Sequence, residues 1–116
     1  MEVYEGSFDS WSDVCREFDE DVAAPDEVLL AVYESELYQG YADVIYRQAD
    51  RYYWVSGSHC SCYGLEGQWD PEDYSAELLI EALRRGDHFY WAGERSDAIR
   101  DAVIDRVHAR SQLGHA

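Results

Sequence analysis

Two neighbouring segments in the middle of the chain restrict its fold more than any other feature, because both have the composition of β-strands. Residues 41–47 and 51–56 are rich in Tyr, Val, Ile and Trp, and a short polar link at residues 48–50 separates them. Two such runs joined by a short polar link predict a β-hairpin. Since an isolated hairpin is marginally stable in water, the rest of the chain must supply further strands and a helix that packs against one face.

The flanking segments complete the prediction of an α+β fold. The apolar run at residues 28–33 predicts a buried strand that joins the hairpin in an antiparallel meander, and residues 88–91 predict either an aromatic connection or a fourth strand. Helical periodicity occurs in three places, and the inner faces of these helices are Trp11, Val14, Cys15 and Phe18; Ala76, Leu79, Ile80 and Leu83; and Ile99, Ala102, Val103 and Val107.

These helices have recognisable ends. The first is predicted over residues 11–20, the second follows an entry or turn signal at residues 70–73 and stops at Gly86, and the third begins at Ser96. We therefore expect a single α+β domain over residues 1–116 with a frayed tail over residues 111–116. It should contain a three- or four-stranded antiparallel sheet with about three helices packed on one face.

The chain is strongly acidic. It contains 25 Asp and Glu against 9 Arg and no Lys, which gives a formal net charge of −16. Residues 1–58 carry 14 acids and 3 Arg, whereas residues 59–116 carry 11 acids and 6 Arg. Such a charge disfavours binding to nucleic acid or to an anionic membrane and favours a basic partner. A merely solubilising surface and adaptation to high salt are the alternative explanations.

The first predicted helix carries a regular series of acids. Asp9, Asp13, Glu17 and Asp21 follow each other at steps of four residues. Four helical residues advance about 6 Å, a spacing comparable with the phosphates along one nucleic-acid strand. Such a row would compete for a basic nucleic-acid channel, whereas a solvated helix face is the alternative. The whole predicted electrostatic surface is Asp9, Asp13, Glu17, Asp19, Glu20, Asp21, Asp26, Glu27, Glu34 and Glu36.

Aromatic side chains cluster in and around the predicted hairpin. Tyr and Trp are favoured at protein interfaces because they provide contact area at a small cost in conformational entropy. If one face of the hairpin is exposed, it forms an aromatic patch rimmed by acids; if both faces are covered, the same residues belong to the core. The predicted aromatic anchors are Tyr38, Tyr41, Tyr52, Trp54, Tyr63 and Trp69.

Cysteine and histidine provide an alternative chemistry. His59, Cys60 and Cys62 lie close together, and Cys15 and His88 are further candidate ligands for zinc. A cysteine beside His59 is also a candidate nucleophile for a small thiol-dependent enzyme. A buried turn in which the cysteines pack under aromatic residues is the simpler interpretation, so no cofactor and no catalytic residue are expected.

The cellular compartment follows from what the sequence lacks. Three cysteines, an odd number, fit a reducing compartment better than a set of disulfides. The chain has no run of about 18 apolar residues, which a membrane-spanning helix needs, and its acidic N-terminus differs from a signal peptide. We therefore expect a cytoplasmic protein.

One distinctive string carries a resemblance. Residues 52–69, YYWVSGSHCSCYGLEGQW, continue into Asp70-Pro71-Glu72, and this stretch resembles a segment of small uncharacterised acidic proteins of phages and mobile elements. It covers about 20 of the 116 residues and carries no catalytic residue. The resemblance implies an inhibitor of host nucleic-acid machinery, of the anti-CRISPR or antirestriction type. Together with the charge, it predicts a non-enzymatic, phage-encoded protein that blocks a basic nucleic-acid-binding surface of a host defence or DNA-processing complex.

Overall fold

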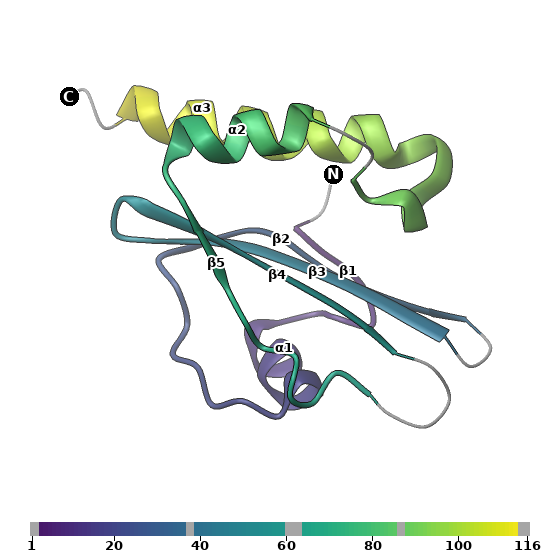
Figure 1. Ribbon diagram of the computed structural model, residues 1–116. Coiled ribbons are helices and arrows are strands. Elements are labelled where there is room, and N and C mark those ends of the chain that lie inside the picture. Colours follow the sequence, from purple (N-terminus) through teal and green to yellow (C-terminus); the bar gives the residue numbers. More distant parts are fainter. Residues whose placement is uncertain (1–2, 37–38, 60–63, 86–87, 114–116) are drawn as a thin grey trace.

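The computed structural model describes residues 3–36, 39–59, 64–85 and 88–113. Within these residues a single five-stranded sheet carries helices on both of its faces, which confirms the α+β class (Figure 1). The strands lie in chain order as β1 (Tyr4–Gly6), β2 (Glu27–Glu36), β3 (Gln39–Gln48), β4 (Arg51–His59) and β5 (Glu72–Tyr74). The helices are α1 (Trp11–Phe18), α2 (Ala76–Arg84), the 3-10 helix η1 (Tyr90–Arg95) and α3 (Ser96–Leu113).

The predicted hairpin is confirmed and is longer than expected. β3 and β4 pair antiparallel from Gly40 opposite His59 to Gln48 opposite Arg51, so a two-residue turn joins them. Ala49 in this turn has a positive φ of 57°, as the first central residue of the tight hairpin turns requires. β2 pairs antiparallel with the other side of β3, which completes the predicted meander.

β1 adds a parallel strand, so the sheet is mixed rather than antiparallel. It pairs with β2 from Tyr4 opposite Ala31 to Gly6 opposite Tyr33. A parallel pair needs a crossover connection, and α1 lies in the connection between these two strands. Gly6 has a φ of +67° beside the Tyr33 carbonyl, where a Cβ atom would collide with the backbone. A strand of three residues is too short for a periodic pattern, which explains why the prediction lacks it.

The acidic segment at residues 70–73, predicted as a helix entry or turn, contributes to a fifth strand instead. Residues 72–74 pair antiparallel with residues 52–54 at the edge of the sheet. The helix α2 begins after this strand, where the Ser75 hydroxyl accepts a hydrogen bond from the Leu78 N–H at 3.2 Å. Ser75 is therefore the N-cap, and Glu72 and Asp73 before it belong to the sheet.

The helices do not share one face, which corrects the predicted arrangement. Leu30 and Val32 of β2 pack in the core with α2 and α3, whereas Ala31 and Tyr33 pack in the core with α1. A bulge next to Leu29 adds that side chain to the α2 and α3 side. A strand that is apolar on both faces needs a cover on both. We call residues 7–26 and 64–70 the α1 layer and residues 75–113 the α2–α3 layer.

The three predicted helices are confirmed, with shifted ends. α1 ends at Phe18, two residues before the predicted end. On α3 the buried residues include Ile104, whereas Ala102 is only partly buried. This helix continues to Leu113, so the tail predicted to fray from Ser111 is helical for three residues before the described chain ends. Residues 88–91 form a connection into η1, and not a strand.

Candidate functional site

The acidic charge is concentrated on the α1 layer. Residues 7–26 and 64–70 contain nine acids and one arginine, a net charge of −8, whereas residues 75–113 contain seven acids and six arginines, a net charge of −1. Asp9, Glu20, Asp21 and Asp70 are exposed members of the α1 layer. The asymmetry between the two halves of the sequence is therefore also an asymmetry between the two faces of the sheet.

The predicted row of four carboxylates does not form on one helix. α1 stops early because Asp19 adopts a left-handed conformation with a φ of 55°. Asp9 precedes the helix, and Asp21 follows its end. Of the four, Asp13 and Glu17 lie within the helix. The carboxylates thus form an acidic surface around both ends of a short helix, without the regular spacing of phosphates.

Two of these carboxylates share one arginine. Arg16 Nη2 lies 2.8 Å from Asp13 Oδ1, and Arg16 Nε lies 3.9 Å from Glu17 Oε1. Asp13 Oδ2 also accepts a hydrogen bond from the Asp9 N–H at 2.9 Å. This N–H, together with the Arg16 guanidinium, lowers the pKa of the Asp13 carboxyl below its ordinary value. Asp13 therefore stabilises the start of α1, and the exposed acids around it form the outward surface.

An aromatic cluster supports the acidic surface from beneath. Trp69 stacks on Tyr46 with 6.0 Å between ring centroids, and it meets Phe18 and Trp11 edge-on at 5.1 and 5.9 Å. Trp11 Nε1–H donates a hydrogen bond to the Val22 carbonyl at 2.8 Å, which ties the segment after α1 to the helix. Stacked and edge-to-face pairs add to the stabilisation from apolar burial. The cluster therefore holds the acids on a fixed scaffold.

The predicted aromatic anchors lie in separate places. Tyr52 and Trp54 are 2% and 8% exposed and belong to the core beneath the α2–α3 layer. Trp69 belongs to the aromatic cluster of the α1 layer. Tyr38 and Tyr63 lie outside the described residues. Because the α2–α3 layer covers the face of the hairpin that carries Tyr52 and Trp54, these two side chains pack in the interior and do not form a surface patch.

The remaining predicted acids lie along β2 and before it. Arg47, whose side chain is 10% exposed, has its Nε 3.3 Å from Glu27 Oε1 and its Nη1 3.7 Å from Asp26 Oδ2. Glu34 is partly exposed on β2, and Glu36 ends that strand. Asp26 and Glu27 therefore neutralise a nearly buried guanidinium, and they add less to an outward negative field than the acids around α1 do.

The candidate metal and thiol residues that the structure describes have protein partners. His59 Nε2 lies 2.6 Å from the Tyr33 hydroxyl oxygen, and Cys15 Sγ lies 3.3 Å from a backbone carbonyl oxygen. Across the described part of the chain, no three His, Cys, Asp or Glu side chains form a group that could hold a metal ion. Cys60 and Cys62 lie outside that part, so the zinc and thiol hypotheses stay predictions.

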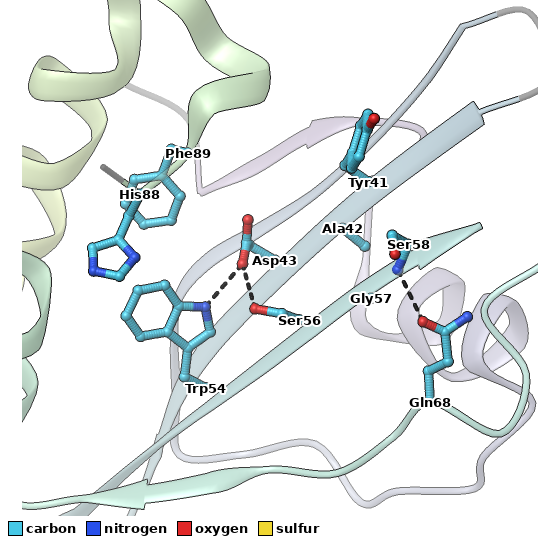
Figure 2. A pocket seen from close by; sticks show the side chains of 10 residues that line it. All are labelled: Tyr41, Ala42, Asp43, Trp54, Ser56, Gly57, Ser58, Gln68, His88 and Phe89. Carbon is cyan, nitrogen blue, oxygen red and sulfur yellow. Dashed lines mark hydrogen bonds between the residues drawn. The ribbon is translucent and has the colours of Figure 1, made fainter. Parts of the chain in front are cut away.

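A pocket beside the α2–α3 layer was not predicted. It has a volume of about 260 Å³ and lies over β3 and β4 (Figure 2). At its floor, Asp43 Oδ1 accepts hydrogen bonds from Trp54 Nε1–H at 2.9 Å and from the Ser56 hydroxyl at 2.8 Å. Asp43 is 9% exposed. Two donors on one carboxylate oxygen fix the orientation of all three side chains.

Aromatic side chains border the pocket on two sides. His88 and Phe89 stand on the side of Trp54, and Tyr41 stands on the other side of the floor (Figure 2). The His88 ring lies 4.9 Å from the Trp54 ring and the Phe89 ring 5.7 Å from it, between centroids. His88 Nε2 lies 2.6 Å from the Ala82 carbonyl oxygen and therefore carries the proton that it donates. Helix α2 and strand β4 together hold this aromatic wall.

A second depression of about 560 Å³ adjoins the first and shares Trp54 and His88 with it. Asp70, Glu72 and Tyr74 line its outer part. The Tyr74 hydroxyl donates a hydrogen bond to Glu72 Oε2 at 2.5 Å, and burial together with this carboxylate raises the pKa of Tyr74 to about 12. Carboxylates are thus present in both depressions.

The pocket contains a serine, a histidine and an aspartate, but they do not form a nucleophilic triad. In such a triad the histidine must reach the serine hydroxyl. Here the Ser56 hydroxyl donates to Asp43, and His88 Nε2 bonds to the Ala82 carbonyl. The arrangement therefore suits the binding of a polar group better than covalent catalysis.

Asp43 and Ser56 are the residues that sequence reasoning missed. One signal was present in the sequence, because Asp43 interrupts the apolar run at residues 41–46 and a charged side chain is rarely buried without partners. Its partner Trp54 lies eleven positions later in the chain, and Ser56 is the next residue on the same face of β4. Only the register of the hairpin brings these side chains together.

Comparisons with protein-family models, with curated proteins and with solved structures found no match. In the part of the chain that the structure describes, no helix combines the length and the apolar character needed to cross a membrane. Function is therefore inferred from the charges, contacts and pockets of this chain.

Proposed function

We propose that this protein is a non-enzymatic inhibitor, of the kind that phages encode. Its acidic α1 layer would occupy a basic nucleic-acid-binding surface of a host defence or DNA-processing complex. One observation carries the proposal: the α1 layer has nine acids and one arginine, while the layer on the opposite face is nearly balanced. A field of one sign steers a basic partner toward the surface and raises the association rate more than the final affinity.

The proposed contact surface consists of the exposed acids around α1 and of the aromatic cluster that fixes them. Asp9 lies before the helix and Glu20 and Asp21 lie after it, and all three are exposed. Trp69 and Trp11 pack beneath this surface. The negative field and its fixed position support competition with nucleic acid, although the carboxylates lack the even spacing of phosphates.

Fluorescence anisotropy of a labelled lysine-rich peptide tests the proposal, with the peptide as a probe for a basic surface. We expect the purified protein to bind the peptide and to release a short DNA duplex from it. Binding should weaken steeply between about 50 and about 300 mM salt, because the contact is made by exposed charges. Affinity that does not change over this range would contradict the proposal.

Two charge-matched variants separate the α1 layer from total charge. Asp9→Asn/Glu20→Gln/Asp21→Asn and a control with Glu77→Gln, Glu94→Gln and Asp105→Asn each remove three negative charges at exposed positions. The first variant should lose about ten-fold in affinity for the peptide and the control about two-fold or less, because the field is local. Equal losses would mean that net charge alone attracts the peptide, and the acidic surface would then be merely solubilising.

A further inference from the structure

One face of the sheet changes from apolar to polar along β3 and β4. Beneath the α2–α3 layer this face carries Ile45 of β3 and Trp54 of β4, which are paired and buried. The next pair on the same face, two residues before Ile45 in β3 and two residues after Trp54 in β4, is Asp43 and Ser56. The pair of Tyr41 and Ser58 follows and lines the same pocket. A concave site that combines aromatic walls with a few fixed polar groups is typical of ligand binding.

The charged residues around this pocket favour a positively charged ligand. Asp43 lies at the floor of the first depression, and Asp70 and Glu72 line the adjoining one. Among the described residues that line these two depressions there is no arginine. In a chain with a formal net charge of −16, such a site attracts a cation.

We propose that the pocket over Asp43 binds the guanidinium group of an arginine side chain from a polypeptide. A guanidinium is planar, presents five N–H donors and is more weakly hydrated than an ammonium, so it suits a carboxylate beside aromatic rings. The Ser58 hydroxyl and the Gln68 side chain, which both line the pocket, offer further oxygen acceptors. A volume of about 260 Å³ leaves room for the guanidinium and part of its aliphatic stem.

The surroundings of the pocket favour a peptide-borne arginine over the free amino acid. The main chain of the ligand would lie toward the outer depression, where Asp70 and Glu72 are found. Free arginine carries an α-carboxylate that these acids repel as well as an α-ammonium that they attract, whereas an arginine within a peptide has no carboxylate there. This inference does not rest on the proposed function, because Asp43 lies on the face of the sheet opposite helix α1 and none of the proposed contact acids Asp9, Glu20 and Asp21 lines the pocket. Only the end of the α1 layer, at Gln68 and Asp70, reaches the edge of the two depressions.

NMR titration of the ¹⁵N-labelled protein with ethylguanidinium tests the site directly. The Trp54 indole N–H donates to Asp43, so its resonance, assigned by its loss in Trp54→Phe, reports on the floor of the pocket. We expect a saturable shift of this resonance, and n-butylammonium should bind about ten-fold more weakly because it lacks the planar fork of donors. A shift that grows linearly without saturation would overturn the proposal, and equal binding of the two cations would overturn the guanidinium assignment.

Three variants test whether ethylguanidinium binds at Asp43 or at acids elsewhere on the protein. Asp43→Asn keeps an oxygen acceptor for Trp54 and Ser56 and removes the charge, so it should weaken ethylguanidinium binding about ten-fold or more. Ser56→Ala should weaken it less while leaving the carboxylate in place. The control Asp105→Asn, on the exposed face of α3, should change the affinity by about two-fold at most. Unchanged binding in a folded Asp43→Asn protein would overturn the site.

The source of the guanidinium is tested with two further probes. Arginine amide should bind more tightly than free arginine, because both carry the α-ammonium and only free arginine carries the α-carboxylate that Asp70 and Glu72 repel. The opposite order would overturn the assignment to a polypeptide. The variant Asp9→Asn/Glu20→Gln/Asp21→Asn should retain pocket binding within about two-fold, since its changes lie on the other layer. Failure of the α1-layer proposal is thereby distinguished from failure of this one.

Discussion

The two layers cover the same sheet with different kinds of residues. The α2–α3 layer packs mostly aliphatic side chains such as Leu83, and its helices place arginines close to acids. Glu81 pairs with Arg85, and Asp97 lies 3.3 Å from Arg100. The α1 layer instead has one eight-residue helix, a cluster of aromatic rings and acids that have a single arginine among them.

This difference shows how a small domain can gather like charges in one place. A helix of eight residues is too short to be stable in isolation, and repulsion among its neighbouring acids weakens it further. Aromatic side chains bury roughly 150–250 Å² each, so a few of them offset that repulsion. The α2–α3 layer does not need such support, because its ion pairs disperse the charge. Concentrated acids thus depend on the aromatic core beneath them.

Truncation of a buried side chain in either core has the largest expected effect on the free energy of unfolding. Phe18 and Leu83 are both fully buried, one in each layer. Phe18→Ala should lower the free energy of unfolding by about 3–5 kcal/mol and Leu83→Ala by about 2–5 kcal/mol, through lost burial and the cavity that remains. Urea unfolding followed by tryptophan fluorescence and by far-ultraviolet circular dichroism measures both losses.

The shape of the urea unfolding transition tests whether the two layers unfold together. Because both layers pack on the same five strands within the described residues, we expect the two probes to give one coincident transition for each variant. Ile99→Val, a smaller truncation in the α2–α3 layer, should lose only about 0.5–1.5 kcal/mol and serves as the graded control. Separate transitions in Phe18→Ala would show that the α1 layer unfolds independently of the sheet.

Removal of negative charge should raise the free energy of unfolding in the α1 layer and lower it in the α2–α3 layer. Glu20→Gln/Asp21→Asn removes two acids near the C-terminal end of α1, where negative charge is unfavourable, so the free energy of unfolding should rise by about 0.5 kcal/mol at low salt. Glu81→Gln/Asp97→Asn breaks two ion pairs and should lower it by about 0.5 kcal/mol. Thermal unfolding at low and high salt measures both. A change of the same sign in both variants would contradict the contrast between the layers.

The sequence contained enough information for the long elements and not for the short ones. Strand-forming composition around a short polar link identified the hairpin, and helical periodicity identified the inner faces of α1, α2 and α3. β1 and β5 have three residues each, so they exist only through pairing with β2 and β4. The continuous apolar run at residues 28–33 was a sign that both faces of β2 are covered, yet periodicity alone does not say which helix covers which face.

The site was less predictable than the fold for the same physical reason. The excess of acids near the N-terminus was readable from composition, but their row on one helix depended on where α1 ends, and the left-handed Asp19 ends it early. Trp54 was predicted as an anchor of an aromatic patch, with a place in the core as the alternative, and it lies in the core. The pocket over Asp43 depends on pairing across the hairpin, which no local pattern encodes.

The smallest expected effect is the pH dependence that Asp13 adds to the α1 layer. The Asp9 N–H and then the Arg16 guanidinium lower the pKa of Asp13 in the folded chain below its ordinary value. Its contribution to stability is therefore fully present above the pKa of the unfolded chain and is lost as the pH falls through the pKa of the folded chain. Asp13→Asn should therefore be less stable than the wild type at neutral pH, with a difference that disappears in acid. Arg16→Gln keeps the Asp9 donor and should show a smaller difference with the same sign. Urea unfolding at several pH values measures both, and a gap between Asp13→Asn and the wild type that persists in acid would show that the carboxylate does not stabilise the start of α1 through its charge.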